Sequence, residues 1–249
     1  MEFKSGPIRL SVGAKPRDPA ADRAQIAAIE GKLAAGEIEA AVALAEAALT
    51  QGLEHPLTFT LAAERLVSED RYPEALAVLE RGHRQSPADL GLRQALGLCL
   101  FRLQRFEAAL PHFDALAAAQ PDFPQGHAAL GATLDALGRP QAAEAAFRRA
   151  NELEPGNLLA VAGLASTASQ AGRHGEARRF AERVLAAEPG YPEAVLVLAR
   201  ADLAEGQHAA GEARLQALIA DPRSAQPQRQ AAQALLGELR AARDRKFDA

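Results

Sequence analysis

Side chains that could bind a metal or act in catalysis are sparse in this sequence of 249 residues, which contains six histidines and one cysteine. His112 and Asp114 have the His-x-Asp spacing of some iron sites. On a helix, however, residues two apart point in different directions, and no third ligand is suggested. The histidines are better explained as partly buried rings between helices than as ligands. We therefore predict no metal site and no cofactor.

Nucleophilic catalysis is equally poorly supported, because Cys99 lies between two leucines, where an inert buried thiol is expected. The sequence lacks a phosphate-binding loop, a dinucleotide fingerprint, a serine elbow, a zinc-protease helix and a paired Cys-x-x-Cys. We predict that this chain is not an enzyme. A basic cluster stands near the carboxyl end: Arg240, Arg243, Arg245 and Lys246. It is either a docking patch or, as we favour, positive charge that complements a helix dipole.

The composition restricts the class of protein further. Hydrophobic residues make up 48% of the chain, enough for an extended core, whereas aromatic residues make up only 4%. A net charge of -4 gives no general attraction to phosphate backbones, so we predict no nucleic-acid partner. Residues 1–12 lack the apolar stretch of a secretory signal, and no later apolar stretch is long enough to span a membrane. We therefore expect no membrane contact. A single cysteine cannot form an internal disulfide, so a cytoplasmic protein is expected.

The chain is organised by an internal period of 34 residues. Four prolines recur at this spacing: Pro87, Pro121, Pro155 and Pro189. Four alanines stand twelve residues before them: Ala75, Ala109, Ala143 and Ala177. Within each period, apolar residues fall at helical spacing in two runs, separated by a polar turn such as the one at Gly138. Each unit is therefore predicted to be a helical hairpin.

These positions resemble the tetratricopeptide repeat, a helix-turn-helix unit of 34 residues. One unit carries the family's signature at Leu96, Gly97, Phe106, Ala109, Phe113 and Pro121. The next carries it at Leu130, Gly131, Gly138, Ala143, Phe147, Ala150 and Pro155. Two residues depart from the family pattern: Asp70 stands where the family has its turn glycine, and Ala165 stands where the family has the glycine of its Leu-Gly pair. The resemblance implies an all-α, right-handed superhelical solenoid in which the first helix of each hairpin lines the concave wall.

This resemblance divides the chain into three parts. Residues 1–20 are predicted to be an extended or flexible tail, and residues 21–222 an array of about six repeats, the first degenerate. Residues 223–249 are predicted to form a capping helix over Gln226–Arg243 and the start of a further, truncated repeat. An ending of this kind suggests a fragment of a longer protein, and a naturally frayed tail is the alternative.

The resemblance also assigns a peptide-binding groove, because ligand peptides of the family contact the first helix of each hairpin. The residues assigned to the groove are Leu57, Glu64, Gln94, Leu98, Phe101, Arg102, Gln125, Asp135, Leu159, Leu196, Arg200 and Leu203. The Lys and Asn clamp with which chaperone-binding members grip a terminal carboxylate is missing, since Thr60, Glu64, Gln94 and Leu98 occupy those positions. A largely apolar segment is therefore the expected ligand. Alternatively, several of these side chains are buried between helices and the groove is closed.

The function predicted from these features is a protein-protein interaction scaffold that binds a largely apolar peptide or helical segment. The partner is another protein or the chain's own N-terminal tail, in which Phe3, Ile8, Leu10 and Val12 alternate with other residues. The alternative is the N-terminal recognition domain of a longer bacterial enzyme, such as a sulfotransferase, a glycosyltransferase or an oxygenase, with catalysis outside this chain.

Overall fold

The computed structural model describes residues 18–222 and 224–247, with side chains described up to residue 239, and these residues form thirteen α-helices and no β-strand. The fold class predicted from the sequence, an all-α array of tandem helical hairpins, is confirmed. The tail predicted over residues 1–20 lies outside the described part, apart from its last three residues. The basic side chains of residues 240–246 lie outside it as well.

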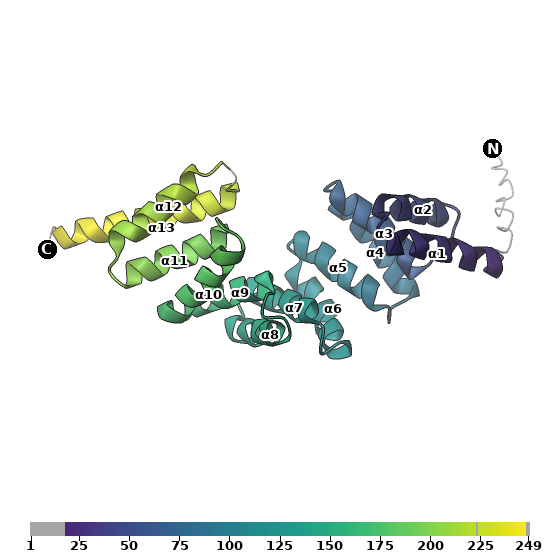
Figure 1. Ribbon diagram of the computed structural model, residues 1–249, viewed down its shortest axis with the longest axis horizontal. Coiled ribbons are helices and arrows are strands. Elements are labelled where there is room, and N and C mark those ends of the chain that lie inside the picture. Colours follow the sequence, from purple (N-terminus) through teal and green to yellow (C-terminus); the bar gives the residue numbers. More distant parts are fainter. Residues whose placement is uncertain (1–17, 223, 248–249) are drawn as a thin grey trace, which may run out of the picture. The chain divides into compact units, whose positions relative to one another are not determined.

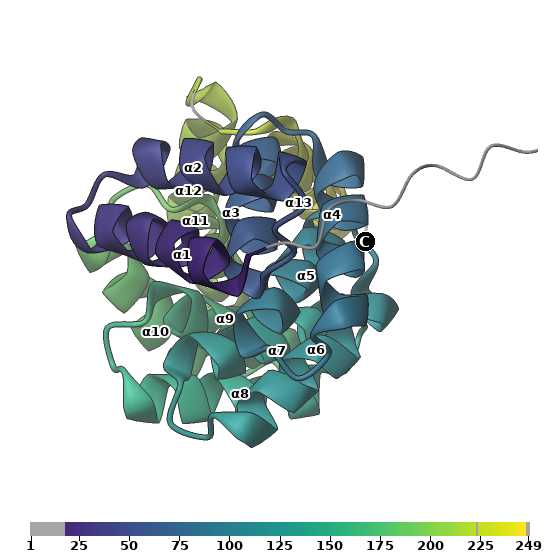
Figure 2. The ribbon, with the colours of Figure 1, turned by 90° about the vertical axis from the view of Figure 1, so that its right-hand side faces the viewer.

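The chain divides into two compact units, residues 1–86 and 87–249. The described helices of the first unit are α1 (Pro19–Ala34), α2 (Ile38–Thr50), α3 (Pro56–Ser68) and α4 (Tyr72–Gln85). Consecutive helices of this unit pack against one another, as the purple and blue ribbons show (Figure 2). The first unit therefore consists of two hairpins, α1–α2 and α3–α4.

The second unit contains four further hairpins and one additional helix (Figure 1). Its helices are α5 (Leu90–Arg102), α6 (Phe106–Ala119), α7 (Pro124–Ala136), α8 (Pro140–Leu153), α9 (Leu158–Gln170), α10 (His174–Ala187), α11 (Pro192–Ala204), α12 (His208–Ala220) and α13 (Gln226–Phe247). First helices also contact each other directly, α5 with α7, α7 with α9 and α9 with α11. They therefore form a continuous layer within the unit.

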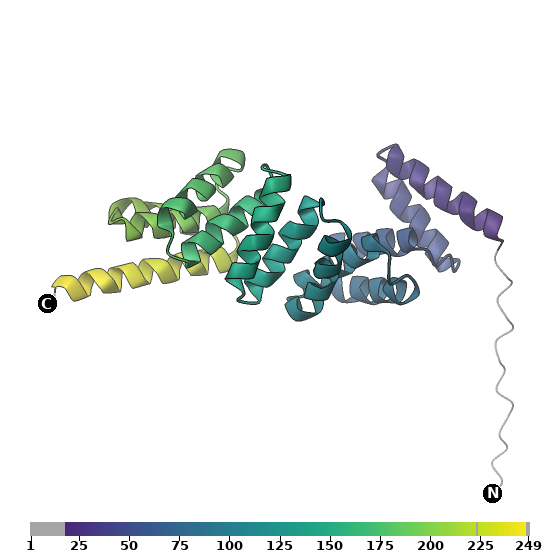
Figure 3. The ribbon, with the colours of Figure 1, turned by 90° about the horizontal axis from the view of Figure 1, so that it is seen from below.

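The α13 helix packs against the last hairpin of the second unit. Ala232 and Leu236 of α13 are buried in one cluster with Leu215 and Leu218 of α12. The helix runs uninterrupted to Phe247 (Figure 3), so the predicted turn of a seventh hairpin is not formed within the described residues.

Proline and capping residues determine where the helices begin and end. Each second helix from α4 to α10 is followed by a C-cap residue that directly precedes a proline of the 34-residue series: Ser86, Gln120, Glu154 and Glu188. These residues leave the helical region because the proline ring clashes with a helical preceding residue. The α3, α7 and α11 helices start with proline, whereas α5 and α9 start after Asp89 and Asn157, whose side chains accept backbone N–H groups. The capping side chain accepts a hydrogen bond from a backbone N–H group that has no partner within the helix. Proline has no N–H group, so it leaves no such donor unsatisfied.

The turn inside every hairpin requires a left-handed residue at the same position of the repeat. The six residues at this position are Gly36, Asp70, Gln104, Gly138, Gly172 and Gly206, with φ between 57° and 79°. The positive φ predicted for Gly138 is confirmed. Asp70 and Gln104 adopt the same conformation with a side chain, at a cost of about 1–2 kcal/mol for a residue other than glycine.

Gln104→Gly is therefore expected to raise the free energy of unfolding by about 1 kcal/mol, because it removes this strain. Chemical denaturation of both proteins measures the difference. The matched control is Gly138→Ala, which is expected to lower stability; no atom lies within 4 Å of the added methyl group, so its effect comes from the backbone alone. An unchanged stability of Gln104→Gly would refute this explanation.

The core is built from small residues on one helix and aromatic rings on the next. Ala75, Ala109, Ala143 and Ala177 are all fully buried, as their periodic spacing predicted. The glycines at Gly97, Gly131 and Gly163 accommodate these rings. A methyl group on Gly131 of α7 would lie 2.7 Å from the ring of Phe147. The rings thus fill the space that these glycines leave.

Candidate peptide-binding groove

A pocket of about 370 Å³ in the second unit is formed by the first helices of four successive hairpins. We call it the larger pocket. Five of the side chains assigned to the groove line it: Phe101 of α5, Asp135 of α7, Leu159 of α9, and Leu196 and Arg200 of α11. These residues come together because the 34-residue period repeats the same helix face in each hairpin. Within the second unit, four first helices thus contribute side chains to one pocket.

A second pocket of about 280 Å³, which we call the smaller pocket, lies between α5, α6, α7 and α9. Its lining includes Gln94, Leu98, Gln125 and Leu159, all of which were assigned to the groove. Leu159 of α9 lines both pockets, and α5 and α7 also contribute side chains to both.

The apolar wall of these pockets is open to solvent. Large hydrophobic side chains are exposed at four positions in the described part of the chain: Ile38, Leu44, Leu98 and Leu159. Leu98 and Leu159 are each 46% exposed, and both line the smaller pocket. The alternative of a closed groove therefore does not hold for these two side chains. Their exposure leaves apolar surface in contact with water, where a ligand could cover it.

The polar groups of the larger pocket are few and only partly paired. Asp135 accepts a hydrogen bond from Gln170 Nε2 at 3.2 Å, and Glu193 accepts one from Gln228 Nε2 at 3.2 Å. Arg200 is exposed and has no ion pair within the described residues. Burial, together with the charges of Glu193 and Glu188, raises the pKa of Tyr191, whose phenol stays neutral at physiological pH. The pocket thus offers one cation and mainly apolar contact area.

Four residues assigned to the groove lie elsewhere. Arg102 is exposed at the end of α5 outside both pockets, and Leu203 lies against Gly211 of α12. In the first unit, Leu57 packs against a core cluster, and Glu64 lines a separate pocket between α2 and α3. For Leu57 and Leu203 the side chain is drawn into packing with a neighbouring helix.

Some lining residues were not identified from the sequence as part of a groove. The larger pocket includes Phe147 and Tyr191, and the smaller pocket includes Phe113 and Leu116. The phenylalanines were recognised only as signature core residues, and the family's contact positions fall on first helices alone. The sequence thus identified these aromatic residues, but their spacing did not show that second helices also line the pockets.

The residues first considered for chemistry, His112, Asp114 and Cys99, lie on helices of the array. Cys99 is 2% exposed, which confirms the predicted buried thiol. His174 and His208 begin α10 and α12, as Tyr72 and Phe106 begin α4 and α6. Among the described residues, no group of three or more His, Cys, Asp and Glu side chains could hold a metal ion. In the same residues, no helix combines the length and apolar character needed to cross a membrane.

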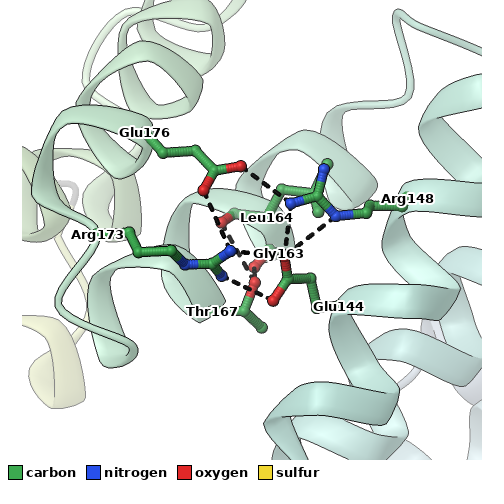
Figure 4. A network of polar contacts seen from close by, with 7 residues as sticks. All are labelled: Glu144, Arg148, Gly163, Leu164, Thr167, Arg173 and Glu176. Carbon is green, nitrogen blue, oxygen red and sulfur yellow. Dashed lines mark hydrogen bonds and ion pairs between the residues drawn. The ribbon is translucent and has the colours of Figure 1, made fainter.

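A charged network joins the α7–α8 hairpin to the α9–α10 hairpin (Figure 4). Glu144 of α8 accepts hydrogen bonds from Arg148 Nη2 at 2.6 Å and from Arg173 Nη2 at 2.7 Å. Arg148 and Arg173 also pair with Glu176 of α10. Hydrogen bonds from Arg173 and Arg148 lower the pKa of Glu144 to about 2. The carboxylate is therefore charged at neutral pH, and its stabilising contribution is lost as the pH falls from about 4.5 toward 2.

A second network holds the last hairpins of the second unit. Asp202 of α11 is 1% exposed and accepts hydrogen bonds from Arg178 Nη2 at 2.7 Å and Arg214 Nε at 2.8 Å. Burial alone raises the pKa of Asp202, but the hydrogen bonds and charges of both arginines outweigh it and lower that pKa overall. Because Arg178 belongs to α10 and Arg214 to α12, one carboxylate joins three helices.

Comparison with known proteins agrees with this architecture. A family model described as tetratricopeptide repeat matches residues 66–132, 136–183 and 168–239. No curated protein matches the sequence. Similar solved structures include PilW, a type IV pilus biogenesis factor, which is 19% identical with a TM-score of 0.67 over 88% of this chain and 100% of that chain.

Two further structures show the same fold. TTC0263, a thermophilic repeat protein of Thermus thermophilus, is 21% identical with a TM-score of 0.58 over 73% of this chain and 100% of its own. YrrB, a repeat protein with an unusual peptide-binding site, is 18% identical with a TM-score of 0.57 over 77% of this chain and 96% of its own. With repeats matched over most of its length, the chain belongs to the tetratricopeptide repeat family.

Proposed function

We propose that the second unit binds a largely apolar peptide or helical segment of another protein across the larger and smaller pockets. Proteins of this family are generally interaction scaffolds and are typically not catalytic. The observation that carries the proposal is the position of Leu98 and Leu159, two half-exposed leucines that line the same pocket. Apolar side chains of a ligand would cover them and gain the free energy of burial.

The chemistry of the lining supports this ligand class. The smaller pocket has two glutamines and no charged side chain, and the larger pocket has one arginine against two carboxylates. A bidentate site for a terminal carboxylate would need paired cationic donors. A helix or an extended strand with spaced apolar residues fits a lining in which leucines come from α5, α9 and α11 and alanines from α7 and α9. YrrB, which has a peptide-binding site by its description, has the same fold.

Peptide selection from a displayed library tests the proposal. Peptides enriched on the full chain should contain spaced apolar residues, and Leu98→Glu with Leu159→Glu should weaken their binding at least tenfold, because charge replaces the apolar contact surface. We choose these two residues because Phe101 makes an edge-to-face contact with Phe106 and has a packing role. The readout is the dissociation constant by fluorescence anisotropy.

The matched control is Leu44→Glu, which places the same charge at a residue that is 40% exposed and lies outside both pockets. Binding that survives the double substitution, or that Leu44→Glu weakens equally, would contradict the proposed site. A cytoplasmic location and a place within a longer enzyme stay predictions from the sequence.

A further inference from the structure

The first unit has a pocket of its own, about 460 Å³ in volume, between α2 and α3. We call it the acidic pocket. Its lining residues are Ile38, Glu39, Val42, Glu64, Arg65, Ser68 and Glu69. Ile38 is 46% exposed, so the pocket presents apolar surface to solvent. Carboxylates from both helices surround this apolar surface.

The negative charge of the acidic pocket is not balanced by its surroundings. Arg65 is the one basic lining residue, and it is already shared between Glu46 at 3.5 Å and Glu69 at 3.4 Å. Glu39 and Glu64 are exposed and have no ion pair within the described residues. Residues 18–86 as a whole contain twelve acidic and six basic side chains. A ligand with spaced positive charges would gain most at this site.

Such a segment precedes the first helix in the same chain. Residues 1–17 contain four basic side chains and one acidic side chain: Lys4, Arg9, Lys15, Arg17 and Glu2. Between the basic residues stand Ile8, Leu10 and Val12, which alternate with other residues. This segment is thus complementary to the acidic pocket in both charge and apolar character. A single extended strand could present its apolar side chains to one surface.

The segment is also long enough. When extended, the ten residues 8–17 span roughly 33 Å, which exceeds the length of about 24 Å of a helix with the 16 residues of α1. The chain enters α1 at Asp18, within the same unit as the acidic pocket. We propose that residues 1–17 dock in the acidic pocket of their own chain, with the Ile8–Val12 segment on Ile38 and basic side chains beside Glu39 and Glu64.

Docking within one chain is favoured over exchange between copies by effective concentration. A short connection gives a local concentration in the millimolar range, so an intrinsic dissociation constant of about 0.1 mM would suffice for roughly nine-tenths occupancy. This inference involves another pocket and another occupant than the proposed function, and each can fail without the other.

A single reporter tests the inference, because the chain contains no tryptophan. In the full chain with Leu10→Trp, the fluorescence should be shielded, with an acrylamide quenching constant several-fold below that of the free 1–17 peptide carrying the same substitution. Adding Glu39→Lys and Glu64→Lys should raise the constant to the peptide value, as should high salt. Circular dichroism confirms that the variants are folded.

The matched control is Glu30→Lys with Glu80→Lys, which changes the charge of the first unit equally at exposed residues of α1 and α4 outside the acidic pocket. The control should leave the tryptophan shielded. The proposal would be overturned if the full chain with Leu10→Trp and an unmodified acidic pocket had the same quenching constant as the free peptide. It would also be overturned if both pairs of charge substitutions removed the shielding equally. Shielding that disappears on dilution would also overturn it, since the segment would then dock on a second copy.

Discussion

Phe147→Ala is expected to lower the free energy of unfolding by about 3–5 kcal/mol, the largest effect of any single substitution that we propose. Phe147 of α8 is 2% exposed, and its ring fills the space beside Gly131 of α7 and Gly163 of α9. Truncation loses the buried apolar area and leaves a cavity between three helices. Equilibrium denaturation monitored by circular dichroism measures the loss.

The glycines provide a second way to examine the same contact. Gly163→Ala places a methyl group in steric conflict with the Phe147 ring and is expected to cost about 1–3 kcal/mol by overpacking. In the Phe147→Ala protein the same substitution should cost much less, because the ring is gone; a double-mutant cycle measures this coupling. Gly175→Ala in α10 is the control, since its added methyl group meets no atom within 4 Å. If the two substitutions lower the free energy of unfolding additively, the packing of the Phe147 ring against Gly163 would be refuted.

Removing both partners of Asp202 is expected to be nearly as damaging. The double variant Arg178→Met and Arg214→Met leaves a buried carboxylate without these two donors and should lower the free energy of unfolding at pH 7 by about 3–5 kcal/mol. Adding Asp202→Leu should restore a large part of the loss, because the unpaired charge is removed. Glu205→Gln is the control, since Glu205 is a more exposed partner of Arg178 and should contribute less than about 1 kcal/mol.

The pH dependence of this loss has a definite sign. In the unmodified chain the folded pKa of Asp202 is lowered, so its stabilising contribution is present above the unfolded pKa and is lost as the pH falls through the folded pKa. In the double variant burial alone remains and raises the folded pKa, so the carboxyl is protonated on acidification and its penalty disappears. The stability difference between the two proteins should therefore begin to shrink above the unfolded pKa, as the carboxyl of the variant is protonated, and should shrink further as the pH falls below about 4 and the unmodified chain loses its own contribution. A difference that is constant with pH would contradict the role of this carboxylate.

The local structure was largely determined by the sequence. Prolines, turn residues and buried alanines recur every 34 residues, and each acts through its own backbone or its nearest helix. The hairpins, the positive φ at Gly138 and the all-α fold could therefore be predicted without coordinates. Asp70 and Gln104 show the strength of this rule, because the turn forms there even without glycine.

The groove depended on tertiary structure, because its walls combine side chains from helices 34 or more residues apart. The repeat position alone did not distinguish Phe101, which lines the larger pocket, from Leu203, which stands at the same position of a later repeat and lies against Gly211. That difference depends on the partner helix: α12 offers a glycine, which leaves room for Leu203. The buried Asp202 was likewise invisible in the sequence, since its two arginines come from different helices. The sequence thus determined the repeat, and packing between repeats decided which of its side chains remain available to a ligand.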